Sequence, residues 1–281
     1  MSKNQNSIRT AESVSPGHPD KLCDQISDAI VDAYLAKDPQ ARVAIDVAGG
    51  HGAVFVTGEV SSRVEVNIAK IVRRIAGKNS EVIERVAEQS PEIARGVNAG
   101  GAGDQGIMVG YACNETPELL PLEVVLARRL NQRLYQRWPY DGKTQVSVRG
   151  CEIVAVVASF QHAPYDELEQ AVKDWVRDEV VRYVDRKYFI ETQTERPTNG
   201  IATENNDPIL HINPAGDWQI GGFDADAGLT GRKLAVDNYG PRIPLGGGAF
   251  SGKDPSKVDR SAAYMARKIA IDYLHRFHAG E

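Results

Sequence analysis

This chain has few cysteines, no long apolar runs and no excess of positive charge. Only three cysteines occur among 281 residues, and Cys23, Cys113 and Cys151 lack the spacing of metal ligands. No apolar run approaches the length of a membrane span, and the polar start MSKNQNSIRT lacks the apolar stretch of a secretory signal. The formal net charge of −5 argues against a general nucleic-acid binder. These absences favour a cytoplasmic protein with reduced thiols and no nucleic-acid or membrane partner.

The stretch from Gly246 to Tyr264 is rich in glycine and lysine and reads GGGAFSGKDPSKVDRSAAY. Glycines leave backbone N–H groups accessible to a phosphate chain, and Lys253 and Lys257 add cationic donors. Asp254-Pro255 predicts a helix start, which would place a helix N-terminus beside the same anion. Asp259 would then lie just inside this helix, where it could bind a metal that bridges phosphates. The alternative is a glycine-rich surface loop with two solvated lysines.

A Walker A loop is excluded for this stretch. Gly247 to Lys253 satisfies G-x-x-x-x-G-K, but Asp254 stands where a Ser or Thr hydroxyl should meet magnesium. No apolar strand leads directly into the segment either. We therefore do not expect a P-loop nucleotide hydrolase.

The segment from Gly17 to Lys21 predicts the start of a helix whose apolar residues recur at helical spacing. Asp20 lies in the first turn beside His18, where the helix dipole stabilises a carboxylate. His18 is either a group that takes part in chemistry or a helix cap. Asp24, Asp28 and Asp32 continue at four-residue intervals, and we interpret these three as a solvated acidic face.

Two hairpin-plus-helix arrangements occur along the chain. The expected strands are 42–47, 53–60, 144–148 and 151–160, and the expected helices follow at about 66–75 and 165–184. This order predicts an α+β fold of repeated units in two layers, with helices covering the sheets. The expected units are residues 1–110, with the N-terminal helix and a mobile glycine-rich loop, and residues 111–281, with the phosphate-binding segments GLTGRK and GGGAFSGKDPSK.

Four motifs in chain order resemble the S-adenosylmethionine synthetase (methionine adenosyltransferase) family. They are GHPDK at 17–21, GAGDQG at 101–106, GLTGRK at 228–233 and the nineteen-residue stretch at 246–264. The resemblance covers most of the chain. It implies an enzyme in which the methionine sulfur attacks C5′ of ATP, after which the expelled triphosphate is hydrolysed to pyrophosphate and phosphate.

The resemblance also implies a role for particular residues. The implied catalytic residues are His18, Lys143, Arg232 and Lys253. The implied ATP-binding residues are His18, Asp141, Lys143, Trp218, Asp226, Arg232, Lys233, Ala249 and Lys253. The implied methionine-binding residues are Glu59, Gln89, Asp104, Asp226 and Lys257. Asp20 and Asp259 would bind Mg²⁺, and Asp46 stands where the family usually carries a K⁺-binding Glu, which leaves a K⁺ requirement open.

The chain also departs from the family pattern. Members resemble a threefold repeat and are typically longer, so this short form is expected to lack the third, C-terminal unit. The resemblance implies a homodimer or higher homo-oligomer with sites at the subunit interface. The alternative is a catalytically weak remnant that binds ATP or hydrolyses triphosphate and acts as a partner subunit. A kinase would also need a base for an attacking hydroxyl, and no candidate is evident.

Overall fold

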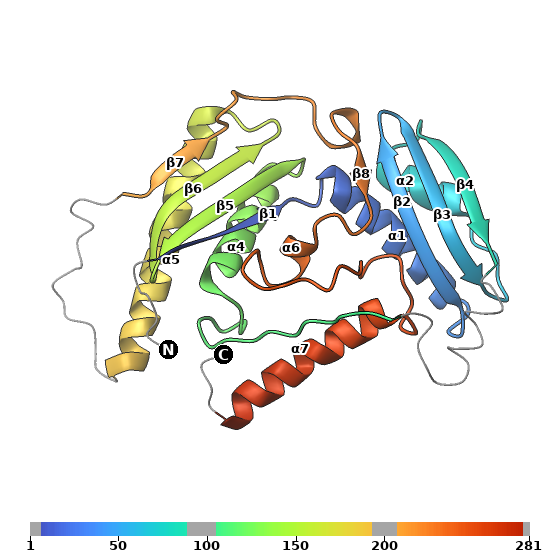
Figure 1. Ribbon diagram of the computed structural model, residues 1–281. Helices are drawn as coiled ribbons and strands as arrows, with labels where there is room; N and C mark the ends of the chain where they lie inside the picture. The colour runs from blue at the N-terminus through green and yellow to red at the C-terminus, as the bar shows by residue number, and fades with distance from the viewer. Residues whose placement is uncertain (1–6, 89–104, 193–206, 278–281) are drawn as a thin grey trace. The chain divides into compact units, whose positions relative to one another are not determined.

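The computed structural model describes residues 7–88, 105–192 and 207–277 and divides the chain into two compact units (Figure 1). The first, here the β1 unit, comprises residues 1–15 and 121–219. The second, here the β2 unit, comprises residues 16–120 and 220–281. The boundary expected between residues 110 and 111 does not follow these units, because the first strand joins the later sheet and the segments after residue 220 join the earlier one.

The β1 unit is a four-stranded sheet of order β1-β5-β6-β7 with two helices. Its elements are β1 (Ile8–Val14), α4 (Leu122–Arg137), β5 (Gly142–Arg149), β6 (Glu152–Phe160), α5 (Tyr165–Thr192) and β7 (Ile209–Ile212). β1 is antiparallel to β5 along all seven of its residues, and β7 runs parallel to β6. Apolar residues of α4, of α5 and of the strands form one core.

The β2 unit contains the second four-stranded sheet, of order β8-β2-β3-β4. Its elements are α1 (Pro19–Leu35), β2 (Arg42–Gly50), β3 (Ala53–Ser61), α2 (Ile68–Ala76), β4 (Glu81–Ala87), a 3₁₀ turn (Gly222–Asp224), β8 (Gly228–Leu229), α6 (Leu234–Asp237) and α7 (Val258–Phe277). β4 runs parallel to β3. α1 and α2 cover one face of the sheet, because their apolar residues form a core with the inward residues of β2 and β3.

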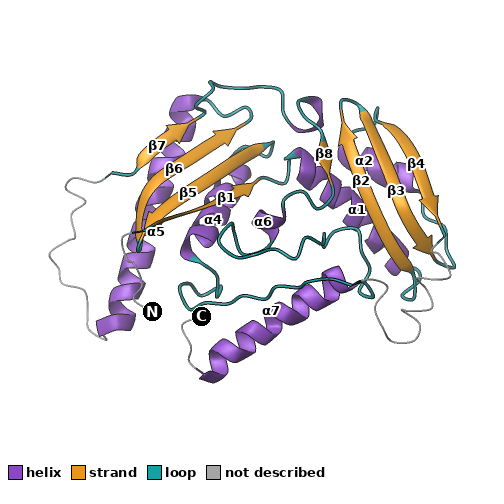
Figure 2. Cartoon of the chain, in the orientation of Figure 1, coloured by secondary structure: helices purple, strands orange, loops and turns teal. Residues whose placement is uncertain are grey.

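The two sheets have the same order of elements (Figure 2). In each, a helix precedes an antiparallel hairpin, a second helix follows, and a final strand pairs in parallel with the second hairpin strand. A further strand pairs antiparallel with the first hairpin strand. The predicted α+β class and both hairpins are confirmed, and this shared layout is what an internal duplication would produce.

Several elements were not expected from the sequence, among them β1, β4, α4, β7 and β8.

Among the helices of the described residues, none has both the length and the apolar character needed to cross a membrane.

Candidate active site

The first turn of α1 brings a histidine and a buried aspartate together. His18 is the N-cap of α1, and its Nδ1 accepts a hydrogen bond from the Asp20 backbone N–H at 3.2 Å. A neutral imidazole that accepts at Nδ1 carries its proton on Nε2, so the ring presents Nε2–H as its donor. His18 is therefore a helix cap and still a side chain able to donate to a substrate oxygen.

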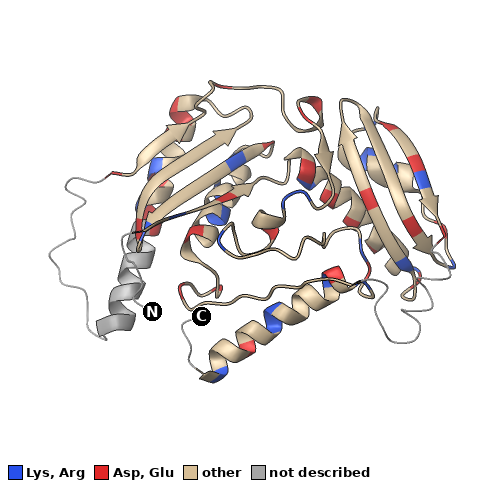
Figure 3. Ribbon diagram, viewed as in Figure 1, with Lys and Arg blue, Asp and Glu red and all other residues tan. Residues whose placement is uncertain are grey.

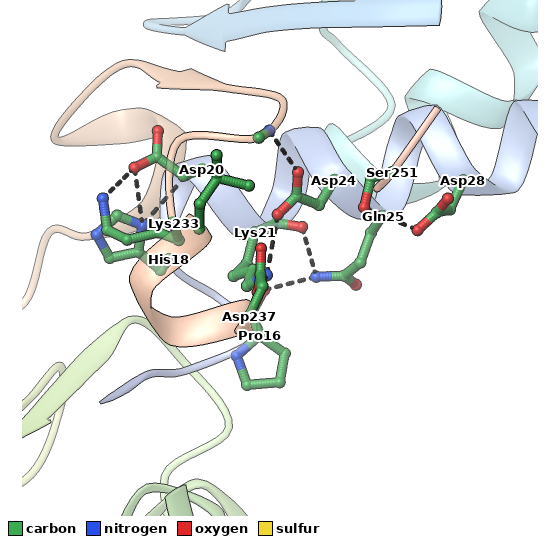
Figure 4. Close-up of polar contacts among 12 residues, drawn as sticks. Pro16, His18, Asp20, Lys21, Asp24, Gln25, Asp28, Lys233, Asp237 and Ser251 are labelled. Carbon is green, nitrogen blue, oxygen red and sulfur yellow. Dashed lines mark hydrogen bonds and ion pairs between the residues drawn. The ribbon is translucent and has the colours of Figure 1, made fainter. Parts of the chain in front are cut away.

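The Asp20 carboxylate holds the segment that follows β8 (Figure 4). Its Oδ2 accepts from Lys233 Nζ. Its Oδ1 accepts from the Leu229 N–H at 3.0 Å and lies 3.5 Å from Arg232 Nε. Burial raises the pKa of Asp20, but hydrogen bonds from Lys233 and Leu229 and the charges of Lys233 and Arg232 outweigh burial, so the net pKa lies below its ordinary value. Asp20 is thus an ionised anchor for two cations.

Asp24 and Asp28 repeat this arrangement further along α1 (Figure 4). Asp24 accepts from the Gly231 N–H at 2.8 Å and from Lys21 Nζ at 3.0 Å. Asp28 accepts from Ser251 Oγ at 2.9 Å. It also accepts from the Gly252 N–H at 3.2 Å. The expected solvated face is therefore wrong for Asp24, which is buried, whereas Asp28 is partly exposed but contacts a loop distant in sequence. We call Asp20, Asp24 and Asp28 the acidic row.

The loops that contact the acidic row also pair with one edge of β2. β8 pairs with Ala48 and Gly49, and the Thr230 N–H donates to the Val47 carbonyl at 3.0 Å. Nearer the start of β2, the Ile45 N–H donates to the Gly252 carbonyl at 2.8 Å, and the Asp254 N–H donates to the Val43 carbonyl at 3.0 Å. Residues 228–233 and 249–257, here the first and second cationic segments, therefore follow one another along a single strand edge.

Glycine is required where the cationic segments approach other backbone. A Cβ at Gly228 would lie 2.2 Å from the carbonyl carbon of Pro19. Gly252 has a φ of 82°, and a Cβ there would lie 2.0 Å from the Ile45 carbonyl oxygen. A Cβ at Gly231 would lie 2.3 Å from that of Ala249, so the two segments also meet each other.

Both lysines of the second cationic segment are paired with aspartates. Lys253 Nζ donates to Asp259 Oδ2, and Lys257 Nζ donates to Asp254 Oδ2. Asp254 is buried and also accepts from the Val43 N–H at 2.6 Å. The predicted helix start at Asp254-Pro255 is wrong: α7 begins at Val258, because both the side chain and the backbone of Asp254 bind β2. Asp259 does lie just inside the helix, as predicted, and because α7 begins at Val258 it lies in the first turn.

The structure separates two other predicted residues from this cluster. Asp46 is exposed on β2 and Glu59 is half-buried on β3, and both alternate with the inward residues that pack against α1. They therefore lie on the sheet face opposite α1. Asp226 is exposed just before β8, where its Oδ1 accepts from the Ala227 N–H at 2.7 Å.

Three predicted residues belong to the β1 unit. Lys143 is on β5 and forms an ion pair with Glu12 at 3.4 Å. Asp141 precedes β5, and its backbone N–H donates to Gln161 Oε1 at 3.3 Å. The indole N–H of Trp218 is buried and, within the described residues, has no hydrogen-bond partner. Gln89 and Asp104 lie outside the described residues.

No group of three or more His, Cys, Asp or Glu side chains that could hold a metal occurs within residues 7–88, 105–192 and 207–277. Asp20 and Asp259 nonetheless suit Mg²⁺ as donors, because Mg²⁺ is commonly bound by one or two carboxylates together with substrate phosphates. In the structure, Asp20 pairs with Lys233 and Asp259 pairs with Lys253. Figure 3 shows the basic stretch between β8 and α6.

Comparison with known proteins identifies the family. Three models of S-adenosylmethionine synthetase match the chain: the N-terminal domain at residues 6–91, the central domain at 99–218 and the C-terminal domain at 220–277. The chain belongs to the S-adenosylmethionine synthetase family. A protein named S-adenosylmethionine synthase from Thermosynechococcus vestitus is 44% identical over 93% of this chain and 71% of its own length. One of the same name from Thermus thermophilus is 43% identical over 93% of this chain and 73% of its own length.

As a family member, the chain is shorter than these relatives, as predicted. Residues 220–277 nevertheless match the C-terminal domain of S-adenosylmethionine synthetase, so that domain is represented here by the first cationic segment, the second cationic segment and α7. Sequence reasoning missed the roles of Asp24, Asp28 and Asp254. For Asp24 and Asp28, the available signal was their four-residue spacing from Asp20, which places these three residues on one face of the helix.

Proposed function

We propose that this chain synthesises S-adenosylmethionine from ATP and L-methionine, with the cationic segments of the β2 unit binding the triphosphate. The observation that carries this proposal is the alignment of both segments along one edge of β2, with the first segment bound to Asp20 in the first turn of α1. In the reaction the methionine sulfur forms a bond to C5′ of ATP, the C5′–O bond breaks, and triphosphate leaves. Water then cleaves the triphosphate to pyrophosphate and phosphate.

Stabilisation of the leaving triphosphate is the main task of these residues. A thioether is a neutral nucleophile, so its attack needs no general base. The barrier then depends on in-line positioning and on donors placed where negative charge develops. Arg232, Lys233 and Lys253 supply cationic donors to the phosphate oxygens, and Ala249 lines the nucleotide beside them.

His18 is the residue we assign to the leaving oxygen. Its Nδ1 accepts from the Asp20 N–H, so Nε2–H is the ring group that would donate to the oxygen that separates from C5′. The first turn of α1 adds the positive end of a helix dipole at the same place. Both features favour the anion that forms in the first step.

Asp20 and Asp259 are the residues that would hold Mg²⁺ with the triphosphate. The ion would neutralise charge on the phosphate oxygens when bound. Lys233 and Lys253, which now pair with these carboxylates, would then donate to phosphate instead. Asp46 lies on the other face of the sheet, and no role is derived for it with K⁺.

Methionine binding is assigned to Glu59, Gln89, Asp104, Asp226 and Lys257. The other ATP contacts are assigned to Asp141, Lys143, Trp218 and Asp226, with Lys143 on the phosphates. Among the residues that the structure describes, the buried indole N–H of Trp218 has no hydrogen-bond partner, which supports a ligand acceptor at that residue. Glu59 lies on a sheet face where Phe55 and Ile83, adjacent in register, are 39% and 37% exposed. We propose that a second copy of the chain covers this face, which would form a homodimer whose site includes Glu59.

Incubation of the purified chain with ATP, methionine and Mg²⁺ tests the proposal, with S-adenosylmethionine and phosphate measured together. Equal amounts of the two products are expected. Phosphate without S-adenosylmethionine would instead favour a triphosphate-hydrolysing remnant. Neither product, with ATP still bound, would contradict the synthetase and favour a partner-subunit role.

A further inference from the structure

The acidic row contacts the two cationic segments at matched intervals. Asp20 and Asp24 bind the first segment at Leu229 and Gly231, and Asp28 binds the second at Ser251 and Gly252. Successive members lie four residues apart on α1, which corresponds to a rise of about 6 Å along the helix. One rigid helix therefore holds backbone N–H groups of both segments.

We propose that Asp24 and Asp28 are positioning residues that set the separation between the two groups of phosphate-binding cations. The inference rests on the proposed function, because it assumes that Arg232, Lys233 and Lys253 bind one polyphosphate. Neither Asp24 nor Asp28 needs to touch the substrate. Each acts through the backbone that carries those side chains.

Asp28 is the more direct case, because it connects three parts of the second segment and of α7. Its Oδ1 accepts from the Gly252 N–H and from Arg260 Nη1 at 3.1 Å, and its Oδ2 accepts from Ser251 Oγ. Arg260 also donates to the Lys253 carbonyl at 2.9 Å. Removal of the Asp28 carboxylate would therefore release both the residue before Lys253 and the guanidinium that holds its carbonyl.

Asp24 combines a buried carboxyl group with a contact to the first cationic segment. Its side chain is 7% exposed, and burial raises its pKa despite the opposing effects of Lys21 and the Gly231 N–H. A carboxyl group whose pKa is raised by folding reduces stability as pH rises above its unfolded-state pKa. A neutral residue of the same shape should therefore be tolerated by the fold. Asp24 nevertheless accepts from the Gly231 N–H, one residue before Arg232.

Asp32 provides the matched control. It is the next residue at the same spacing on α1, it is exposed, and within the described residues its side chain contacts neither cationic segment. We therefore compare positions on one helix face that contact the cationic segments with one that does not. The variants are Asp24→Asn, Asp28→Asn, Asp28→Ala and Asp32→Asn. Asp28→Asn keeps an oxygen acceptor and should recover part of what Asp28→Ala loses.

The experiment combines steady-state kinetics, in which ATP and methionine are varied separately, with calorimetric binding of inorganic tripolyphosphate and thermal unfolding. For Asp28→Ala we expect kcat to fall about 10- to 100-fold, because displacement of a binding group by about 1 Å can cost this much. Tripolyphosphate affinity and KM for ATP should worsen about tenfold. KM for methionine should stay within about twofold of the parent value. Asp24→Asn should lose activity without losing thermal stability, and Asp32→Asn should match the parent chain.

Unchanged tripolyphosphate affinity and unchanged KM for ATP in both Asp24→Asn and Asp28→Ala would overturn the inference, even if either variant unfolded at a lower temperature. If Asp28→Ala does not fold, the isosteric Asp28→Asn decides by the same readouts. If the parent chain binds tripolyphosphate but makes no S-adenosylmethionine, the proposed function is contradicted but the positioning role is not. The tripolyphosphate affinities of the variants then test the positioning role. A parent chain that binds no tripolyphosphate overturns both.

Discussion

The two sheets differ at the edge beside their first hairpin strand. In the β1 unit, seven-residue β1 covers β5 without interruption. In the β2 unit, the corresponding edge of β2 is occupied by two-residue β8 and, further along, by the single bridge between Ala44 and Lys253. One edge is completed by a regular strand, whereas the other is completed by two short segments that carry cations.

The helices beneath these edges differ in the same way. Counted from the first helical residue, Asp20, Asp24 and Asp28 of α1 correspond to Glu123, Ala127 and Asn131 of α4. On α4, Glu123 lies 3.4 Å from Arg9 Nη1, and Asn131 Nδ2 donates to the Ser13 carbonyl, so these residues hold β1. The same helix positions thus serve a structural strand in one unit and the proposed phosphate-binding segments in the other.

The largest expected effect follows the loss of a cation from the β2 edge. Lys253→Ala should lower kcat about 100- to 1,000-fold, since it removes a donor to the charge that develops on the triphosphate. Initial rates of S-adenosylmethionine formation measure the loss. Lys268→Ala, on the exposed surface of α7 where Lys268 pairs with Asp272, should retain full activity. Comparable losses in both variants would mean that the position of Lys253 carries no special role.

A smaller effect is expected when the close approach at the β2 edge is blocked. Gly252→Ala should lower both activity and stability, because its Cβ would meet the Ile45 carbonyl oxygen at 2.0 Å. Gly52→Ala is the control: its φ of 81° nearly equals that of Gly252, but nothing lies within 4 Å of its Cβ. The control should lose only about 1–2 kcal/mol from the positive φ. Urea unfolding and initial rates on both variants separate backbone strain from displacement of the segment.

On the β1 side, substitution should affect stability and leave activity intact. Asn131→Ala should lower the free energy of unfolding by about 1–2 kcal/mol, because it leaves the buried Ser13 carbonyl without this partner. Activity per folded molecule should match the parent chain. A selective loss of tripolyphosphate affinity in Asn131→Ala would show that the two edges are not functionally distinct.

Acid should weaken the β2 edge through Asp254. Burial raises the pKa of Asp254, but hydrogen bonds from Lys257, Ser256 and Val43 bring the net pKa below its ordinary value. A lowered folded-state pKa contributes stability above the unfolded-state pKa, and this contribution disappears as pH falls through the folded-state value. Asp254→Asn should therefore be less stable near neutral pH and lose less stability between about pH 5 and about pH 2. Urea unfolding across this range tests the sign, and an unchanged slope in the variant would contradict it.

The smallest effect concerns the thiols. Burial raises the pKa of Cys23 to about 12, with added repulsion from Asp20 and Asp24, so this thiol should stay protonated and unreactive. Cys151 is exposed, whereas Cys23 and Cys113 are buried. A thiol reagent should modify Cys151 first without loss of activity. Rapid modification of Cys23 in the native chain would show that the β2 edge opens readily.

Local patterns predicted the hairpins and the capped start of α1, because alternating apolar residues and His18-Pro19 act over short distances. The glycine and lysine motifs likewise predicted the cationic segments. The contacts of Asp24 and Asp28 could not be predicted, since a carboxylate facing solvent and one facing a loop over 200 residues away have the same local sequence. The pairing of β1 with β5 was missed for the same reason, because it joins strands more than 100 residues apart. Alternation of apolar and polar residues can predict a strand but not the strand with which it pairs.

The most direct test of the contrast between the two edges is amide hydrogen exchange with and without inorganic tripolyphosphate. If both cationic segments bind one polyphosphate, peptides covering residues 228–233 and 249–257 should gain protection over the same concentration range, while the peptide covering β1 should not change. Protection of only one cationic segment, or equal protection of β1, would contradict a shared site along β2.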